Sequence, residues 1–436
     1  MTKRVRWCLV AVAVFVALAT WLLWPASEKP YHDLVARYRA TGVAVEYDDL
    51  RGPPVPPEEN GAADLQAALA WLAANMPSEN EWKAPGPWNA SRDADWQDHA
   101  TPADWAELAD LAAKLDPFLR LVEKAAAKPA IEFLDDPRDV FGFADGAHIR
   151  TLQRIQRVVF ASAAGARDEA RRLDAIACEA ALAGRLSCTT VIDHMVAMAI
   201  GAESTRRTRS EIESGRLDAA TARARLDPLL RTQWLARVPR ILGAERVYLL
   251  QAYRTVLEGT FPWPKRKWYE RVWDNITRRG TLSSSFDEIG RGMALPIVAF
   301  SERLREAEAV PLRHGPDYAK EIQRLVGDTR SAGPVGDFVP QLLTLLTRTD
   351  AQQRLARVAL AAAEHRATHG DFPASLDELK PMFPDGLPLD PYTDAPFVYA
   401  RTASGARIAS LGRLPEETPL DDATLRERVL VWEVKR

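Results

Sequence analysis

Cysteine is scarce in this chain, which has only three among its 436 residues. A framework of several disulfides is therefore excluded as the source of its stability. Cys8 lies in an apolar run, whereas Cys178 and Cys188 are ten residues apart. On one unbroken helix that spacing is about 15 Å, too long for a disulfide, so a bridge between them would need a turn near Gly184.

An excess of charge of one sign is also absent. The chain has 57 Lys and Arg against 60 Asp and Glu, which gives a formal net charge of -3. Such a balance provides no basic field for nucleic acid, and we expect no nucleic-acid partner. The hydrophobic share of 47% and the charged share of 27% are typical of a folded chain, long enough here for two or three domains.

The motifs of the common enzyme classes are missing too. G-x-S-x-G, the P-loop, G-x-G-x-x-G, C-x-x-C and H-E-x-x-H do not occur. His365 and His369 have the i, i+4 spacing of two metal ligands, but Arg366 stands where a zincin has its glutamate. Capping and packing at a helix C-terminus is the favoured role for these histidines. The sequence therefore predicts no catalytic, cofactor-binding or metal-binding residue.

Three other segments have plain structural explanations beside their functional ones. Ser283–Ser285 followed by Glu288 is typical of a helix capping box, with a nucleophilic serine as the alternative. Asp135-Asp136 before a proline is typical of a solvated turn, with an acid/base pair as the alternative. Phe261–Arg279 mixes aromatic and basic residues, which favours a helix with its aromatics packed inward over a patch that touches lipid or a polymer.

One long hydrophobic run is present. Trp7 to Trp24 is a stretch of 18 uncharged, mostly apolar residues, about 27 Å long as a helix and bounded by tryptophans that suit the two membrane interfaces. Three cationic residues precede it: Lys3, Arg4 and Arg6. The positive-inside rule then leaves residues 1–6 in the cytoplasm and the chain after Pro25 outside. We expect a single-pass protein of the inner membrane, in contact with lipid through residues 7–24, with a periplasmic body.

A cleavable signal peptide is the main alternative to this signal-anchor. Ala17-Leu18-Ala19 matches a cleavage site, but cutting there would leave Trp21 to Trp24 exposed at a new N-terminus. A buried soluble helix is disfavoured because the run is apolar all round. The uncleaved transmembrane helix is the favoured interpretation.

Beyond the anchor, the patterns favour a mainly α fold with a multi-helix antiparallel body and a small C-terminal α+β module. Residues 25–147 are interpreted as a linker with helical and Trp-rich parts, in which Thr101-Pro102 begins a helix. Residues 148–347 form the helical body. The expected helices of these two regions are Tyr31–Arg39, Asn60–Asn75, His148–Val159, Asp168–Leu186, Thr189–Ser214, Asp218–Thr232, Val238–Leu257, Phe286–Ala309, Asp317–Val326 and Asp337–Leu346.

The last region, residues 350–436, changes period. A helix over Asp350–His369 is closed by Gly370, and three short strands follow, separated by turn residues. The expected strands are Phe397–Ala400, Arg407–Leu411 and Arg428–Val434. They predict a small antiparallel sheet packed on the preceding helix.

A family resemblance lies in this last region. Four features follow one another here: a long helix, Gly370-Asp371-Phe372-Pro373, Leu389-Asp390-Pro391-Tyr392 and Phe397-Val398-Tyr399. In this order, the stretch of about 80 residues resembles the C-terminal globular part of the major pseudopilins of type II secretion. The resemblance implies a helix leading into a three-stranded meander. Some pseudopilins hold calcium in the loop before the last strand, where Asp421-Asp422 stand here, but the surrounding oxygen ligands have no match in this sequence. A pseudopilin's prepilin site is missing, so a polymerising pilus subunit is not expected.

The whole layout is similar to large bacterial membrane-anchored envelope families, a resemblance that implies no activity. The favoured hypothesis is a membrane-tethered, non-enzymatic binding or scaffold protein with a partner in secretion or envelope assembly. The alternative is an envelope hydrolase that acts on cell-wall or polysaccharide material through carboxylates, with sugars stacked on the tryptophans of Trp82 to Trp105.

Overall fold

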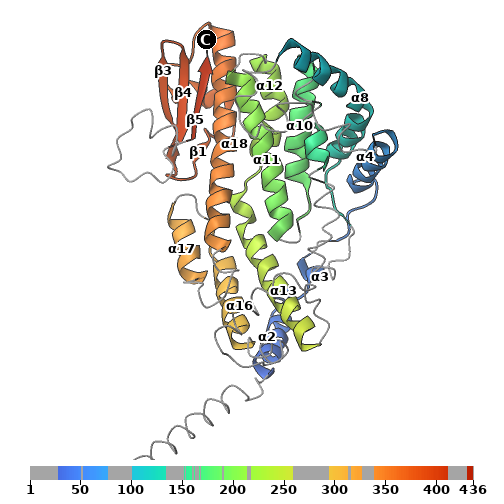
Figure 1. Ribbon diagram of the computed structural model, residues 1–436. Helices are drawn as coiled ribbons and strands as arrows, with labels where there is room; N and C mark the ends of the chain where they lie inside the picture. Colours follow the sequence, from blue (N-terminus) through green and yellow to red (C-terminus); the bar gives the residue numbers. More distant parts are fainter. Residues whose placement is uncertain are drawn as a thin grey trace, which may run out of the picture.

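The computed structural model describes residues 28–50, 53–76, 101–133, 168–188, 191–213, 218–258, 294–312, 316–326, 338–410 and 430–435, with 152, 154–159, 162 and 166 between them. It is mainly helical, with a small antiparallel sheet at the C-terminus (Figure 1). The α-helices are α2 (Lys29–Ala40), α3 (Tyr47–Leu50), α4 (Ala62–Asn75), α8 (Pro102–Ala127), α10 (Glu169–Arg185), α11 (Val191–Glu213), α12 (Ala219–Leu226), α13 (Val238–Leu257), α16 (Ala294–Glu308), α17 (Pro316–Val326) and α18 (Phe338–His369).

Short 3-10 helices and strands complete the described chain. The 3-10 helices are η3 (Leu229–Arg231), η4 (Leu235–Arg237) and η7 (Leu376–Met382). The strands are β1 (Leu389–Asp390), β2 (Ala395–Pro396), β3 (Val398–Thr402), β4 (Gly405–Ser410) and β5 (Leu430–Lys435).

Side-chain caps fix the starts of two long helices where the sequence predicted them. At α8, the Thr101 hydroxyl accepts from the backbone N–H of Asp104, while the Asp104 carboxylate accepts from the backbone of Thr101, with Pro102 at the first turn. At α10, the Asp168 carboxylate accepts from the N–H of Ala170. Each cap satisfies an amide that the first helical turn leaves without an intrahelical partner.

Helix α18 is longer than expected, because it joins the two predicted helices Asp337–Leu346 and Asp350–His369 into one. The polar residues between them suggest a helix start, but Thr347 and Thr349 instead donate hydrogen bonds to the carbonyls four residues earlier. The helix therefore continues across the expected domain boundary between residues 347 and 350. At 32 residues it is about 48 Å long and runs along much of the molecule (Figure 1).

The predicted helix over Asp218–Thr232 is shorter than expected. It ends as α12 at Leu226, and η3 follows after Asp227-Pro228, since a proline removes a helical N–H and disfavours a continuing helix before it. Asp227 has a structural use, because it accepts from Arg231 at 2.8 Å and from Arg357 of α18 at 2.8 Å. The break thus ties α12 to the central helix.

The C-terminal module has the predicted helix, turns and meander. Gly370 ends α18 in the left-handed region (φ 81°), and its N–H donates to the carbonyl of Arg366. Strand order in the sheet is β3-β4-β5, all antiparallel, with Ile408 opposite both Tyr399 and Trp432. The buried face of β4 and β5 packs on α11 and α18, with Ile408 and Trp432 in the shared core.

Two neighbouring residues, Asn60 and Gly61, join α4 to the segment after α8. The Asn60 amide donates to the carbonyl of Glu132 at 2.8 Å and accepts from its N–H at 2.9 Å. A Cβ on Gly61 would lie 2.6 Å from the carbonyl oxygen of Ala125, so only glycine allows this approach. The core here is continuous with Ile155 and Val159 of the predicted helix over His148–Val159.

The two ends of the described chain lie at opposite ends of the molecule. Figure 1 shows α2 and α3 at one end, beside α13 and α16, and the sheet β3-β4-β5 at the other. Helix α18 contacts the sheet and α17, and α17 in turn contacts α16, which packs on α2 (Figure 1). A segment that entered at α2 would therefore meet the body at the end remote from the C-terminal module.

Candidate functional site

Residues 28–50, the first segment that the structure describes, pack against helices α13 and α16. We call this segment, together with the faces of α13 and α16 that it contacts, the N-terminal dock. Its centre is a core of its own, formed by Tyr31, Leu34, Tyr38, Val45, Leu250 and Tyr253. The Tyr31 ring meets the Tyr253 ring edge to face, with centroids 5.0 Å apart. Each large apolar side chain buried here stabilises the contact by roughly 1.5–3 kcal/mol.

Local sequence explains why α2 presents this face. Tyr31, Leu34, Val35 and Tyr38 follow the 3-4 spacing of an amphipathic helix, and Pro30 stands in the first turn, where it needs no hydrogen-bond donor. At its C-terminus, Arg37 and Arg39 suit the negative end of the helix dipole. The chain is therefore helical and one-sided before it meets α13.

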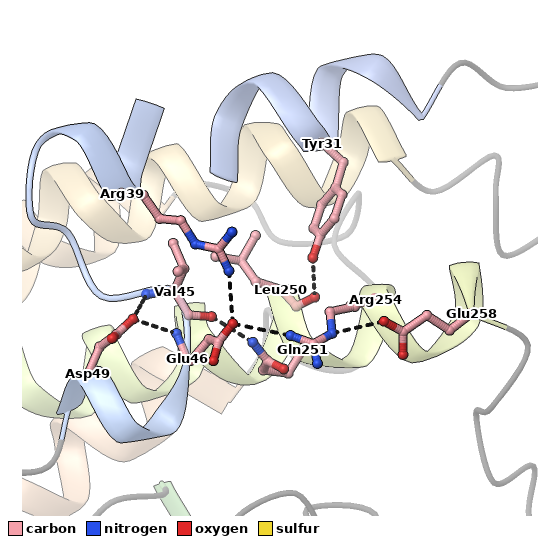
Figure 2. Close-up of polar contacts among 9 residues, drawn as sticks. All are labelled: Tyr31, Arg39, Val45, Glu46, Asp49, Leu250, Gln251, Arg254 and Glu258. Carbon is pink, nitrogen blue, oxygen red and sulfur yellow. Dashed lines mark hydrogen bonds and ion pairs between the residues drawn. The ribbon is translucent and has the colours of Figure 1, made fainter. Parts of the chain in front are cut away.

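Hydrogen bonds fix the register of the dock (Figure 2). The Tyr31 hydroxyl donates to the carbonyl of Leu250 at 3.1 Å, and the Gln251 amide donates to the carbonyl of Val45 at 2.8 Å. Burial raises the pKa of Tyr31 to about 12, so its phenol stays a donor at every physiological pH. Asp49 accepts from the N–H groups of Val45 and Glu46 and so closes the turn before α3.

Ion pairs surround that core. Glu46 lies between two cations, Arg39 at 2.8 Å and Arg254 of α13 at 3.2 Å, and Arg254 also contacts Glu258 at 3.1 Å (Figure 2). These side chains are 40–60% exposed, so each pair contributes little by itself. Together they link the end of α2 and the turn before α3 to α13.

Arg246 of α13 is the buried charge of the dock. Its side chain is 1% exposed, and its guanidinium donates to the carbonyl of Ala44, contacts Glu308 of α16 at 3.2 Å and lies over the Tyr38 ring with its Cζ 5.2 Å from the centroid. One side chain thus connects the segment after α2, α13 and α16. The arrangement holds these three elements together as a joint.

The sequence predicted the helix of the N-terminal dock but not which helices it packs against. Residues 25–147 were expected to be a linker with helical parts, and Tyr31–Arg39 was predicted as a helix, as observed. The packing of residues 28–50 on α13 and α16 was missed. The apolar spacing of α2 could have indicated a buried face, but its partner lies about 200 residues later in the chain and no local pattern identifies it.

The two histidines with metal-ligand spacing lie at the C-terminus of α18. Nδ1 of His365 hydrogen-bonds the carbonyl of Asp371 at 3.1 Å, and Nδ1 of His369 hydrogen-bonds the carbonyl of His365 at 3.0 Å. Their rings stack with centroids 4.2 Å apart. Within the described ranges, no three His, Cys, Asp or Glu side chains gather in a way that could hold a metal ion. The pair has the capping and packing contacts that the sequence favoured.

Several sequence candidates lie outside the described residues: Asp135-Asp136, Ser283–Ser285, Phe261–Arg279, Asp421-Asp422 and the tryptophans at 82, 88 and 96. Of the Trp-rich segment, Trp105 is described, and it is half-buried against the main core from the first turn of α8. It therefore packs as a structural residue.

Two thiols, of Cys178 and Cys188, and the imidazole of His194 are buried and are not activated as nucleophiles. Cys178 and Cys188 are both buried and both free, so they form no bridge. Burial raises the pKa of Cys178 well above its usual value and that of Cys188 to about 12, which keeps both as unreactive thiols. His194, 2% exposed, has its pKa lowered to about 3 by burial and then by Arg237, so it is neutral.

A buried charge cluster joins α10 to α11. Glu203 accepts from Arg206 at 2.7 Å and from Arg207 at 3.1 Å, and Arg207 lies 3.3 Å from Glu179 of α10. Burial raises the pKa of Glu179 to about 8, whereas the hydrogen bonds and charges of the two arginines outweigh burial at Glu203 and lower its pKa to about 2. Arg206 is 40% exposed and Glu203 22%, whereas Arg207 and Glu179 are buried, so the cluster joins the two helices along their interface.

The expected anchor, residues 7–24, lies outside the described residues, and no helix among those described is long and apolar enough to cross a membrane. Comparison of this chain with protein-family models, curated proteins and solved structures found no match.

Proposed function

We propose that this chain is an envelope protein held in the inner membrane by residues 7–24, with a helical body and C-terminal module that bind another envelope component. One observation supports it above the others: the segment that directly follows the expected anchor is bound to the body through a dedicated core and the buried Arg246. A freely flexible linker leaves the orientation of the body free and has no need of a packed contact with it. A tether that orients the body relative to the membrane needs such a contact.

The position of the dock supports the same proposal. It lies at the end of the molecule opposite the sheet β3-β4-β5 (Figure 1). If residues 7–24 are embedded in lipid, the body stands on its α2 end and presents the C-terminal module away from the bilayer. Helix α18, about 48 Å long, then separates that module from the membrane surface. This geometry suits a scaffold that reaches across the periplasm.

A binding or scaffold role accounts for the polar groups of the described chain without chemistry. The buried thiols are protonated, the buried histidine is neutral and the charge cluster of Glu203, Arg206, Arg207 and Glu179 joins two helices. The hydrolase alternative needs a cleft with two carboxylates and stacking tryptophans. Among the described residues, Trp105 from that segment packs on the core, and no observation there favours the hydrolase.

Fractionation tests the tether. The full chain with a C-terminal epitope tag is expressed, and membranes are washed with alkaline carbonate. We expect the tagged chain to stay in the pellet, and a matched chain that starts at residue 28 to be released. Protease added to spheroplasts should remove the tag. Release of the full chain by carbonate, or a tag protected from external protease, would contradict the proposal.

Crosslinking tests the scaffold role separately. In intact cells, a photoreactive amino acid at exposed Ser404 in the β3-β4 turn is expected to form a discrete adduct with a single envelope component. The same amino acid at Asp33 of α2, beside the dock, is the matched control and should give no such adduct. Equal adducts at both positions, or none at Ser404, would remove the support for a binding surface on the module.

A further inference from the structure

Strand β3 (Val398–Thr402) is an open edge of the C-terminal sheet. Among the strands that the structure describes, the order is β3-β4-β5, so β3 is paired on one side only, whereas β5 at the opposite edge also contacts α11 and α18. Proteins commonly protect an open edge with a proline or a bulge, because unpaired backbone N–H and C=O groups attract another strand. Strand β3 contains no proline, and its five residues pair one to one with those of β4, without a bulge. The edge is therefore available to another strand.

The register of the β3-β4 hairpin determines which backbone groups face the open edge. Only two residues separate Thr402 from its partner Gly405, so these two form a hydrogen-bonded pair, and such pairs recur at every second residue of an antiparallel ladder. Ala400 therefore bonds to β4, while Tyr399 and Arg401 turn their N–H and C=O groups away from it. Within the described ranges, these four outward groups have no hydrogen-bond partner. An extended backbone is the structure that matches their spacing.

The side chains of β3 leave this edge accessible and give it a chemical character. Val398 is 42% exposed, and Ala400 and Arg401 are exposed as well. Val398 and Ala400 lie on one face of the strand, because side chains alternate, and form an apolar strip. Arg401 on the other face forms an ion pair with Asp371, in which both side chains are half-exposed. A strand added here would meet apolar side chains on one face and a cation on the other.

We propose that β3 is a docking edge, to which an extended segment of another envelope protein adds as a fourth strand. The proposal deepens the scaffold role and rests on it. The backbone groups of Tyr399 and Arg401 hold the segment by hydrogen bonds, whatever its sequence. Its side chains provide the selection: an apolar residue covers Val398 and Ala400, and a carboxylate lies beside Arg401. A basic segment is disfavoured, since like charges on neighbouring strands repel.

A second copy of this chain does not fit the same edge. Copies related by a two-fold axis would pair their β3 strands antiparallel. Because the strands of the sheet run along α18 (Figure 1), the two bodies would then point in opposite directions, with their α2 ends apart. Two chains anchored in one membrane cannot adopt that arrangement. The occupant is therefore a different chain.

Proline substitution tests this edge while sparing the bonds to β4. Arg401→Pro removes the arginine side chain and an N–H that faces the open edge, whereas Arg401→Ala removes the side chain alone. Both changes are made in the full chain that carries the photoreactive amino acid at Ser404, and crosslinking is done in intact cells. We expect the adduct to be at least tenfold weaker with Arg401→Pro than with Arg401→Ala, because a backbone hydrogen bond is lost and the ring occupies the place of the added strand.

A second measurement leaves the backbone of β3 unaltered. The photoreactive amino acid is placed at Val398 on β3 or at Leu345 on α18, two large apolar side chains that are 42% and 40% exposed. Position 398 should give the same adduct as position 404, and position 345, the matched control, should give less than about a tenth of it. This comparison decides the proposal even if Arg401→Pro fails to fold.

The outcomes separate strand addition from the scaffold role. An adduct at Ser404 that is equally strong with Arg401→Pro and Arg401→Ala, or equal adducts at positions 398 and 345, would overturn strand addition and leave the scaffold role standing. An adduct of the chain with its own copy would overturn it in favour of self-pairing. No adduct at either position 404 or position 398 would remove both proposals.

Discussion

Replacing Arg246 by methionine is the most informative change in the N-terminal dock. Methionine keeps much of the aliphatic volume but removes the guanidinium that contacts Ala44, Glu308 and the Tyr38 ring. If the dock is a specific joint, losing this side chain should free residues 28–50 from the body while leaving the rest of the fold in place.

The magnitude of the effect follows from burial. Breaking a fully buried ion pair by removing one partner costs about 3–5 kcal/mol. The Glu308 side chain is 24% exposed, so water partly solvates the carboxylate that remains, while the carbonyl of Ala44 loses its donor. We therefore expect a loss of about 3 kcal/mol of docking free energy.

Hydrogen exchange followed by mass spectrometry measures this loss at the segment itself. A loss of about 3 kcal/mol corresponds to exchange of residues 28–50 that is over a hundredfold faster, with α4 and α8 unchanged. Arg254→Met is the matched control, because it removes an arginine of the same helix that is 41% exposed and should cost less than about 1 kcal/mol. Faster exchange in Arg254→Met than in Arg246→Met would refute the reasoning from burial.

Two further changes test other parts of the fold. Asn60→Ala removes the hydrogen bonds to both backbone groups of Glu132, so the free energy of unfolding, measured in urea, should fall by about 3 kcal/mol. The control is Asn75→Ala at an exposed helix end, which should lower that free energy by under about 0.5 kcal/mol. Glu179 has a folded-state pKa of about 8 against an ordinary value of 4.5, so the folded state binds more protons and stability is lost as pH rises through that range. Glu179→Gln should make urea unfolding less dependent on pH between those values, and an unchanged dependence would show that Glu179 does not titrate there.

Local signals in the sequence predicted many of the elements. Thr101 begins α8, Asp168 begins α10, and Gly370 ends α18 with a positive φ, because caps and left-handed glycines act within a few residues. The three strands lie where the period changes, each within about two residues of its predicted ends. Ala395–Pro396 also pairs with β1 in a two-residue ladder that no alternation indicated.

Long-range contacts were beyond the sequence patterns. Thr349 and Asp350 look like a helix start, yet the Thr349 hydroxyl donates to the carbonyl of Leu345 inside α18, and Asp350 forms an ion pair with Arg354 of the same helix at 2.7 Å. Glu179 and Arg207 read as ordinary surface charges of two helices, and only their burial against each other turns them into a cluster.

The candidate sites divide in the same way. The histidines of α18 could be assigned to a helix terminus from spacing and dipole alone. The dock could not, because Gln251 meets Val45 only once the chain has folded. Pattern reasoning identifies elements and caps, whereas the dock depends on which elements become neighbours.

Energy transfer to the membrane surface tests the central claim, that a lipid-embedded segment and a fixed dock hold the body upright. In a Cys8→Ser background, a donor dye is placed on Asp33→Cys in α2 or on Ser404→Cys in the β3-β4 turn, both exposed, and the full chain is inserted into bilayers with acceptor-labelled headgroups. We predict strong transfer from position 33 and weak transfer from position 404, with position 404 gaining transfer when Arg246→Met frees the dock. Equal transfer from the two positions, or stronger transfer from 404, would contradict the account.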